Sequence, residues 1–166
     1  MKRWASVLAV LVLATAGLAA CGDDGAAPGG TTAPSPAGDV ALATATVGDY
    51  GKVIVDGNGR TVYVFDKDTS GTSNCSGDCL AKWPPVPAAE GTPKVDGIDA
   101  SLVSTITRAD GTKQLAVKGL PVYLFASDSK PGEAKGQAVG GVWWVVGADG
   151  QKITTKPGDS GNGYGY

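Results

Sequence analysis

The chain carries the stretch Tyr63-Val64-Phe65-Asp66-Lys67-Asp68 and, sixty residues later, the similar stretch Tyr123-Leu124-Phe125-Ala126-Ser127-Asp128. Four neighbouring positions repeat with the same spacing: Gly59, Val62, Trp83 and Val86 recur as Gly119, Val122, Trp143 and Val146. A unit that recurs at a fixed spacing can bury its apolar face against its own copy. The duplication therefore predicts one pseudo-symmetric domain of two repeats, at about residues 48–86 and 104–146.

Short β-prone runs with turn residues between them surround the two copies. Three pairs of runs have this form: 52–55 with 61–65, 104–107 with 114–117, and 142–146 with 152–154. The intervening Asp, Asn and Gly residues favour hairpin turns. The 26 Gly and 10 Pro leave little room for helices beyond one turn at 79–83. We therefore predict an all-β fold, a single compact domain of antiparallel hairpins at residues 44–156.

These repeats resemble a family of bacterial lipoproteins with a duplicated Tyr-x-aromatic-x-x-Asp motif, described as secreted repeats of unknown function. The resemblance extends to the Cys75–Cys79 loop that leads into Trp83-Pro84-Pro85, and to Gly140-Gly141-Val142-Trp143-Trp144 in the second copy. It covers nearly the whole predicted domain. It implies an exported lipoprotein and brings no established activity, substrate or catalytic residue with it.

The first 21 residues have the order of charge and size of a cleaved export signal. Met1-Lys2-Arg3 is basic, residues 4–17 are almost wholly apolar, and Leu18-Ala19-Ala20 precedes Cys21. The apolar run is shorter than the about 20 residues that a membrane-spanning helix needs. The segment resembles a lipobox, so we expect a signal peptide at 1–20 and acyl chains such as palmitate on Cys21. The alternative is an ordinary secretory signal with an incidental cysteine.

The predicted domain lies between two segments of low complexity. Residues 21–43 are mostly Gly, Ala, Pro, Thr and Asp, with no aromatic residue, and residues 157–166 are rich in Gly. Such segments cannot offset their ordering entropy by burying apolar surface. We expect a flexible tether at 21–43, a loose tail at 157–166, and a protein held by lipid at the extracytoplasmic face of the cell membrane.

The charge of the chain excludes some partners. Without the signal, 12 basic residues stand against 16 acidic ones, a net charge of −4, and the lysines are scattered singly. Nucleic acid binding requires a basic patch, and electrostatic attachment to anionic lipid requires a basic cluster. We expect no nucleic acid partner. The expected partners are the membrane, through the lipid anchor, and an envelope partner or ligand that the sequence does not identify.

The repeated motif has two interpretations. Strand alternation places Tyr63 and Phe65 on one face and Val62 and Val64 on the other, so both faces favour burial. An Asp just beyond the strand can accept hydrogen bonds from turn N–H groups or from a neighbouring Tyr hydroxyl. The motif is then either an aromatic core with locked turns or a ligand cleft between the copies. The candidate residues are Tyr63, Phe65, Asp68, Trp83, Tyr123, Phe125, Asp128, Trp143 and Trp144.

The remaining cysteines, Cys75 and Cys79, are predicted to form a disulfide, because the protein is exported and Cys21 carries lipid. The alternative is an envelope redox or copper-handling protein that uses this pair. Residues 66–71 also match the first half of a calcium loop, but Gly77 occupies the position that needs a bidentate Glu.

The composition argues against catalysis. The chain contains no histidine, which removes the Ser-His and Cys-His couples of the commonest hydrolases. No phosphate-binding loop is present, because Gly57-Asn58-Gly59 leads into a predicted strand. We expect no enzyme, no cofactor and no metal site. The prediction is a lipid-anchored binding or interaction module whose ligand is unknown.

Overall fold

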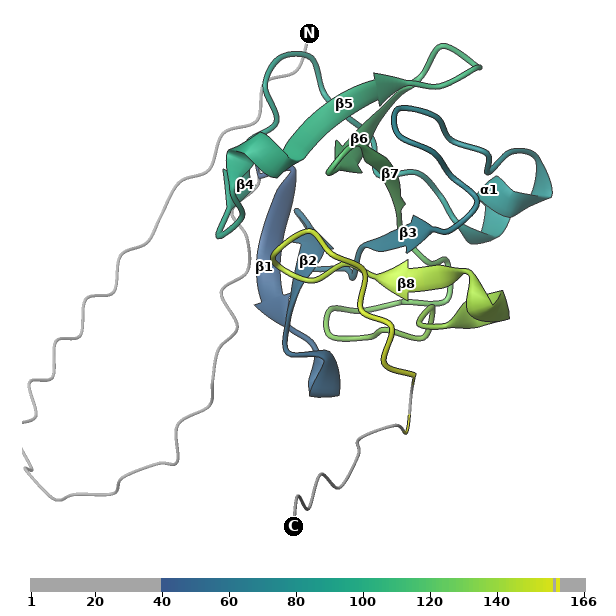
Figure 1. Ribbon diagram of the computed structural model, residues 1–166. Helices are drawn as coiled ribbons and strands as arrows, with labels where there is room; N and C mark the ends of the chain where they lie inside the picture. Colours follow the sequence, from purple (N-terminus) through teal and green to yellow (C-terminus); the bar gives the residue numbers. More distant parts are fainter. Residues whose placement is uncertain (1–39, 157, 159–166) are drawn as a thin grey trace, which may run out of the picture. The chain divides into compact units, whose positions relative to one another are not determined.

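The computed structural model describes residues 40–156 and 158. Within them the regular secondary structure is mostly strand, with one short α-helix and three 3-10 turns (Figure 1). This confirms the all-β prediction. The signal peptide with Cys21, residues 21–39 of the expected tether and nearly all of the expected tail lie outside the described residues. No helix in the described part of the chain has the length and apolar character needed to cross a bilayer.

The first sheet has three strands in the order β2-β1-β4. β1 (Leu42–Thr46) and β2 (Lys52–Asp56) form an antiparallel hairpin around a 3-10 turn (Gly48–Tyr50), and β4 (Val95–Asp96) lies parallel to β1. The first strand begins two residues before the expected domain start at residue 44. The folded chain starts earlier because Leu42 is completely buried in the core.

The second sheet has five strands in the order β5-β6-β7-β3-β8. Their bounds are Val103–Thr107 for β5, Lys113–Val117 for β6, Leu120–Tyr123 for β7, Tyr63–Phe65 for β3 and Trp143–Val145 for β8. All neighbouring strands in this sheet are antiparallel. The predicted hairpin of residues 104–107 with 114–117 is confirmed as β5 and β6.

The predicted hairpin between 52–55 and 61–65 forms only next to its turn, where the Asp56 amide donates to the Arg60 carbonyl at 2.8 Å and the Val62 amide donates to the Ile54 carbonyl at 3.1 Å. The turn itself forms, since the Gly59 amide donates to the Asp56 carbonyl at 2.9 Å and Gly59 has a φ of 79°. Beyond a single bridge from Val55 to Thr61, however, β2 and β3 belong to different sheets. The physical reason is that β3 is apolar on both faces, and in its position between β7 and β8 apolar side chains from the rest of the domain cover both of them.

Two other local predictions have mixed outcomes. The expected strand at 152–154 is reduced to one bridge, from Lys152 to Val146, after a turn at the end of β8. The expected helical turn is confirmed as α1 (Asp78–Lys82), which ends before Pro84. Short 3-10 turns at Ala100–Leu102 and Val139–Gly141 complete the described elements.

The two repeats are related by an approximate two-fold axis between β3 and β7. Tyr63 pairs with its own counterpart Tyr123, and the contact of Tyr63 with Val145 is matched by a contact of Tyr123 with Pro85. Identical positions of the two copies therefore lie opposite each other at the centre of the sheet, as a two-fold arrangement requires.

Backbone hydrogen bonds also join the repeats outside the central strands. The Ile54 amide of the first repeat donates to the Val146 carbonyl of the second at 2.8 Å, and the Leu115 amide of the second donates to the Val86 carbonyl of the first at 2.9 Å. In addition, β3 of the first repeat lies within the sheet that the strands of the second repeat form. The chain forms one intertwined domain, in agreement with the predicted pseudo-repeats.

Two apolar clusters lie on the two faces of the central strands. Val62 and Val64 point into the first cluster, together with Val122 and Leu124 of the other repeat. Tyr63 and its counterparts point into the second. That second cluster contains Ala43, Val47, Val53, Val55, Tyr63, Cys75, Trp83, Tyr123, Trp143 and Val145. Both faces of the motif strands are buried, so the motif lies at the centre of the fold.

Candidate functional site

Two reciprocal hydrogen bonds join the repeats at the motif. The Tyr63 hydroxyl donates to Asp128 Oδ2 at 2.5 Å, and the Tyr123 hydroxyl donates to Asp68 Oδ2 at 2.6 Å. Both tyrosines are completely buried, and the two aspartates are nearly so. The tyrosine of each copy therefore bonds the aspartate of the other copy, across the approximate two-fold axis.

Each aspartate uses its second oxygen to close a loop of its own repeat. Asp68 Oδ1 accepts the Asn74 amide at 2.7 Å, and Asp128 Oδ1 accepts the Lys135 amide at 2.9 Å. The two interactions that an Asp at this position can make, with a turn amide and with a Tyr hydroxyl, are thus both present in both copies. Every carboxylate oxygen of the motif is occupied within the protein.

Burial changes the acid strength of these groups. Burial, reinforced by the bond to Asp128, raises the pKa of Tyr63, and burial with the bond to Asp68 raises the pKa of Tyr123 to about 12. Burial also raises the pKa of Asp68, although its hydrogen bonds from Tyr123 and Asn74 act in the opposite direction. Both phenols therefore remain protonated donors far above neutral pH.

The aromatic residues of the motif form a continuous stack across the axis. Trp83 and its counterpart Trp143 lie face to face, with ring centroids 3.8 Å apart and planes within 3°. Phe65 stacks on the outer face of Trp143 at 4.2 Å, and Phe125 lies against the outer face of Trp83 at 4.4 Å. Each phenylalanine thus covers the tryptophan of the other repeat.

The motif tyrosines meet this stack edge to face. Tyr63 contacts Trp83 at 5.4 Å, and Tyr123 contacts Trp143 at 5.2 Å. The backbone of Gly136 approaches so closely that a Cβ there would lie 2.8 Å from both the Tyr63 and Trp83 rings. Of the two interpretations of the motif, this packing fits the aromatic core, because these rings lie against each other and leave no room for a ligand between them.

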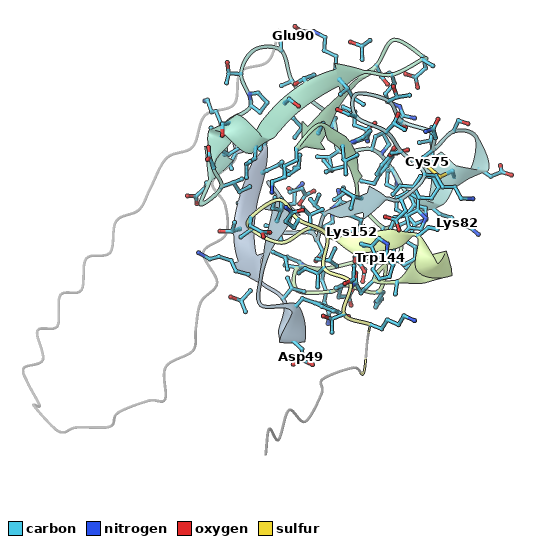
Figure 2. All side chains as sticks on the ribbon, viewed as in Figure 1. Asp49, Cys75, Lys82, Glu90, Trp144 and Lys152 are labelled. Atoms are coloured by element: carbon cyan, nitrogen blue, oxygen red, sulfur yellow. A yellow bond between two sulfur atoms is a disulfide. The ribbon has the colours of Figure 1, made fainter. Side chains whose placement is uncertain are left out.

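Trp144 lies apart from this group, in the other apolar cluster. Its indole N–H donates to Asp66 Oδ2 at 2.7 Å, and Lys152 Nζ donates to Asp66 Oδ1 and lies 5.8 Å from the Trp144 ring centroid (Figure 2). In a calcium loop the carboxylates of Asp66 and Asp68 would both face the same ion. Here they bond to separate sets of partners, which does not fit the calcium alternative. No group of three or more Cys, Asp or Glu able to hold a metal is found within the described residues.

Cys75 and Cys79 form the predicted disulfide, with their Cα atoms 5.4 Å apart. Cys75 is buried against the aromatic cluster, and Cys79 is half-buried at the start of α1. The surrounding residues from 69 to 82 are mostly exposed and polar. The bridge therefore constrains the middle of a surface loop, which we name the disulfide loop (residues 69–82).

Arg108 anchors this loop from the inside, although the sequence analysis did not identify it. Its Nη2 donates to the Cys75 carbonyl at 2.7 Å, and its Nη1 donates to Ser73 Oγ at 2.8 Å and to Gln114 Oε1. Ser73 Oγ in turn is 2.7 Å from the Tyr123 hydroxyl. One buried guanidinium thus connects the disulfide loop to a Tyr–Asp pair.

A comparison of the two repeats would have revealed Arg108. Arg108 is the counterpart of Val47 in the first repeat. The Arg108 amide donates to the Thr112 carbonyl, just as the Val47 amide donates to the Gly51 carbonyl. A charged residue where the other copy has a buried valine is a signal for a special role. Its Nε has no hydrogen-bond partner and lies 3.8 Å from Asp110 Oδ2.

Two surface cavities lie away from the motif. One of about 280 Å³ is lined by Val40, Ala41, Asp56, Gly57, Asn58, Arg60, Val86 and Pro87. Another of about 230 Å³ is lined by Ala41, Ala89, Glu90, Thr92, Pro93, Lys94 and Leu115. Both are smaller than the about 300 Å³ at which small-molecule pockets usually begin, and the Asp56 carboxylate is already bonded to Arg60 at 3.1 Å.

Fold and motif together define a class of protein: an all-β domain in which two sequence repeats share a central sheet and are joined by reciprocal Tyr–Asp bonds. The chain belongs to a family described as a secreted repeat of unknown function, whose model matches residues 44–87 and 104–147. The first match starts before the expected residue 48 and includes part of β1. Searches of curated proteins and of solved structures find no match. Family membership indicates an extracytoplasmic module.

Proposed function

We propose that the protein is a lipid-anchored interaction module that displays the disulfide loop to a partner in the cell envelope. One observation carries the proposal: the repeated motif is fully satisfied within the protein, whereas the disulfide loop is exposed and its bridge occurs in only one repeat. We therefore assign recognition of a partner to the disulfide loop, whose bridge has no counterpart in the second repeat.

The construction of the disulfide loop supports this role. The bridge, the two bonds from Arg108 and the Asn74–Asp68 bond all hold a segment whose outer residues, such as Ser76 and Asp78, face solvent. A loop held in one conformation loses less entropy on binding than a mobile one. Binding residues also commonly lie on loops that a rigid scaffold positions.

Site-specific photo-crosslinking in the producing cell tests the interaction. A photo-reactive amino acid at Ser76 should give a discrete adduct, and the same residue at Glu90, which is also exposed, should not. Replacing Cys75 and Cys79 by Ser should weaken the adduct from Ser76. Equal adducts from both positions, or none from Ser76, would contradict the proposal.

The lipid anchor is a separate part of the proposal, and it leads to a direct prediction. Cys21→Ser should leave an unprocessed or released, soluble product, because no thioether lipid can form and the net charge gives no affinity for anionic lipid. Partition of the protein between detergent and water phases measures this. A Ser variant that still enters the detergent phase after signal cleavage would exclude the anchor.

The second candidate function is thiol–disulfide exchange in the envelope. One observation favours it: the second repeat makes the same Tyr–Asp bond and holds the same tryptophan without any disulfide, so the architecture does not require the bridge. Copper binding would first require reduction of the two sulfurs. Free thiols at Cys75 and Cys79 in freshly isolated protein, detected by alkylation and mass spectrometry, would favour this candidate over the first.

A further inference from the structure

The buried aromatic cluster combines two stacked indoles with two hydrogen-bonded phenols. Indoles and phenols are the protein side chains, besides thiols and thioethers, that most readily lose one electron. The Trp83–Trp143 pair is nearly parallel at 3.8 Å, so the positive charge of an oxidised indole can spread over both rings. Tyr63 and Tyr123 touch this pair edge to face, one on each side of the axis.

Each phenol has a proton acceptor already in place. An oxidised phenol is a strong acid, so it keeps its charge only if the proton has nowhere to go. Here Asp128 and Asp68 lie 2.5 and 2.6 Å from the Tyr63 and Tyr123 hydroxyls. Because both phenols are buried and cannot ionise by themselves, the electron and the proton must leave together.

Side chains that usually compete for oxidants are scarce in the folded domain. The only methionine of the chain is Met1, and no histidine is present. Cys75 and Cys79 are already joined as a disulfide, which removes both thiols. Thioethers and thiols are the usual first targets of oxidants in proteins. Among the described residues, the tryptophans and tyrosines are therefore the side chains that an oxidant can oxidise most readily.

We propose that this cluster is a site of one-electron oxidation that accepts oxidising equivalents from outer-sphere one-electron oxidants. The oxidant takes one electron from the Trp83–Trp143 pair and is reduced. Tyr123 or Tyr63 then returns an electron to the indole, and its hydroxyl proton moves to Asp68 or Asp128. The net products are the reduced oxidant, a neutral tyrosyl radical and a protonated aspartate, so charge, atoms and electrons balance.

Photo-oxidation of the purified chain tests this, with photogenerated tris(bipyridine)ruthenium(III) as the oxidant. The test protein carries Tyr50→Phe, Tyr164→Phe and Tyr166→Phe, so that Tyr63 and Tyr123 are its only tyrosines. A transient indole signal should decay into a tyrosyl signal, seen by optical absorption and by electron paramagnetic resonance. Persistence of the indole radical, with no tyrosyl signal, would overturn the proposal.

The role of the carboxylates has its own measurement. Adding Asp68→Asn and Asp128→Asn should slow tyrosyl formation about a hundredfold, the usual effect of removing a positioned proton acceptor, whereas the surface variant Asp149→Asn should not. Because the double variant can also fail to fold, the test protein itself is measured in D₂O, where tyrosyl formation should be slower than in H₂O. Equal rates in the two solvents would contradict coupled proton transfer.

Discussion

At the scale of single residues, the domain depends on a few buried polar groups that satisfy each other. Asp68 and Asp128 each accept one bond from a tyrosine of the other repeat and one from an amide of their own loop. A buried group without a partner would cost about 1–3 kcal/mol. Loss of either partner of a Tyr–Asp pair should therefore destabilise the domain.

The raised tyrosine pKa values predict a loss of stability in alkali. An unfolded tyrosine ionises near pH 10, whereas Tyr123 in the fold has a pKa of about 12. Between these values the unfolded chain has released the proton and the folded chain has not. The stabilisation is therefore complete below pH 10 and is lost as the pH rises to 12, by about 1.4 kcal/mol per pH unit.

Tyr123→Phe isolates this effect. The variant lacks the proton in question, so its free energy of unfolding should fall less steeply over the same pH interval. Denaturant titrations at several pH values between 10 and 12 supply the measurement. Identical slopes for parent and variant would show that Tyr123 ionises equally in the folded and unfolded chains.

Arg108→Val, which introduces the residue of the other repeat, should destabilise the domain by about 2 kcal/mol or more. The substitution removes one donor each from the Cys75 carbonyl and Ser73 Oγ. It also leaves Oε1 of the completely buried Gln114 unpaired, and an unpaired buried acceptor is costly. Lys113→Val, which breaks an exposed pair with Glu90, is the control and should change stability little. Urea unfolding measures the free energy of unfolding of both variants. Equal losses of stability would show that Arg108 does not anchor the loop.

At the scale of elements, the disulfide loop is the clearest difference between the repeats. Replacing Cys75 and Cys79 together by Ser should lower the free energy of unfolding by about 2 kcal/mol, since the bridge closes a very short loop. The variant should still fold, because the second repeat forms the equivalent loop without a bridge. Thermal melts measure the change. If the variant were unfolded, the fold would require the bridge and the prediction would be wrong.

Local turn chemistry made some elements predictable from the sequence. The hairpin of β5 and β6 follows from Asp110-Gly111 between two β-prone runs, and α1 ends where Pro84-Pro85 forbids a helix. The pairing of β3 with β7 and β8 was not predictable in this way. It joins residues 58 or more positions apart, and a local pattern carries no information on which distant edge a strand meets.

In the candidate site, too, the contacts between distant residues could not be predicted from the sequence. The sequence identified the motif residues and the disulfide, because their types and spacing are repeated or paired. It did not show that the tyrosine of one copy bonds the aspartate of the other, since Tyr63 and Asp68 are neighbours in the chain and Asp128 is not. Arg108 was missed because, beside Asp110-Gly111, it resembles an ordinary turn residue.

At the scale of the whole domain, the two repeats are held together as one unit. Backbone hydrogen bonds join Val146 to Ile54 and Val86 to Leu115, and the aromatic stack lies on the axis between the copies. Each repeat contributes one tyrosine and one aspartate to the reciprocal pairs, whereas the disulfide occurs in one repeat. A feature that both halves of a two-fold fold need is architectural, and the central claim is that the reciprocal Tyr–Asp pairs hold the repeats together.

Melting of Asp68→Asn and Asp128→Asn tests this claim most directly. Each variant should lose about 1–3 kcal/mol of stability, because a carboxylate that accepts a buried tyrosine hydroxyl and a loop amide is replaced by an amide. Asp149→Asn, in an exposed turn, is the matched control and should melt like the parent. If both motif variants also melted like the parent, the pairs would not hold the repeats together and the architectural account would be contradicted.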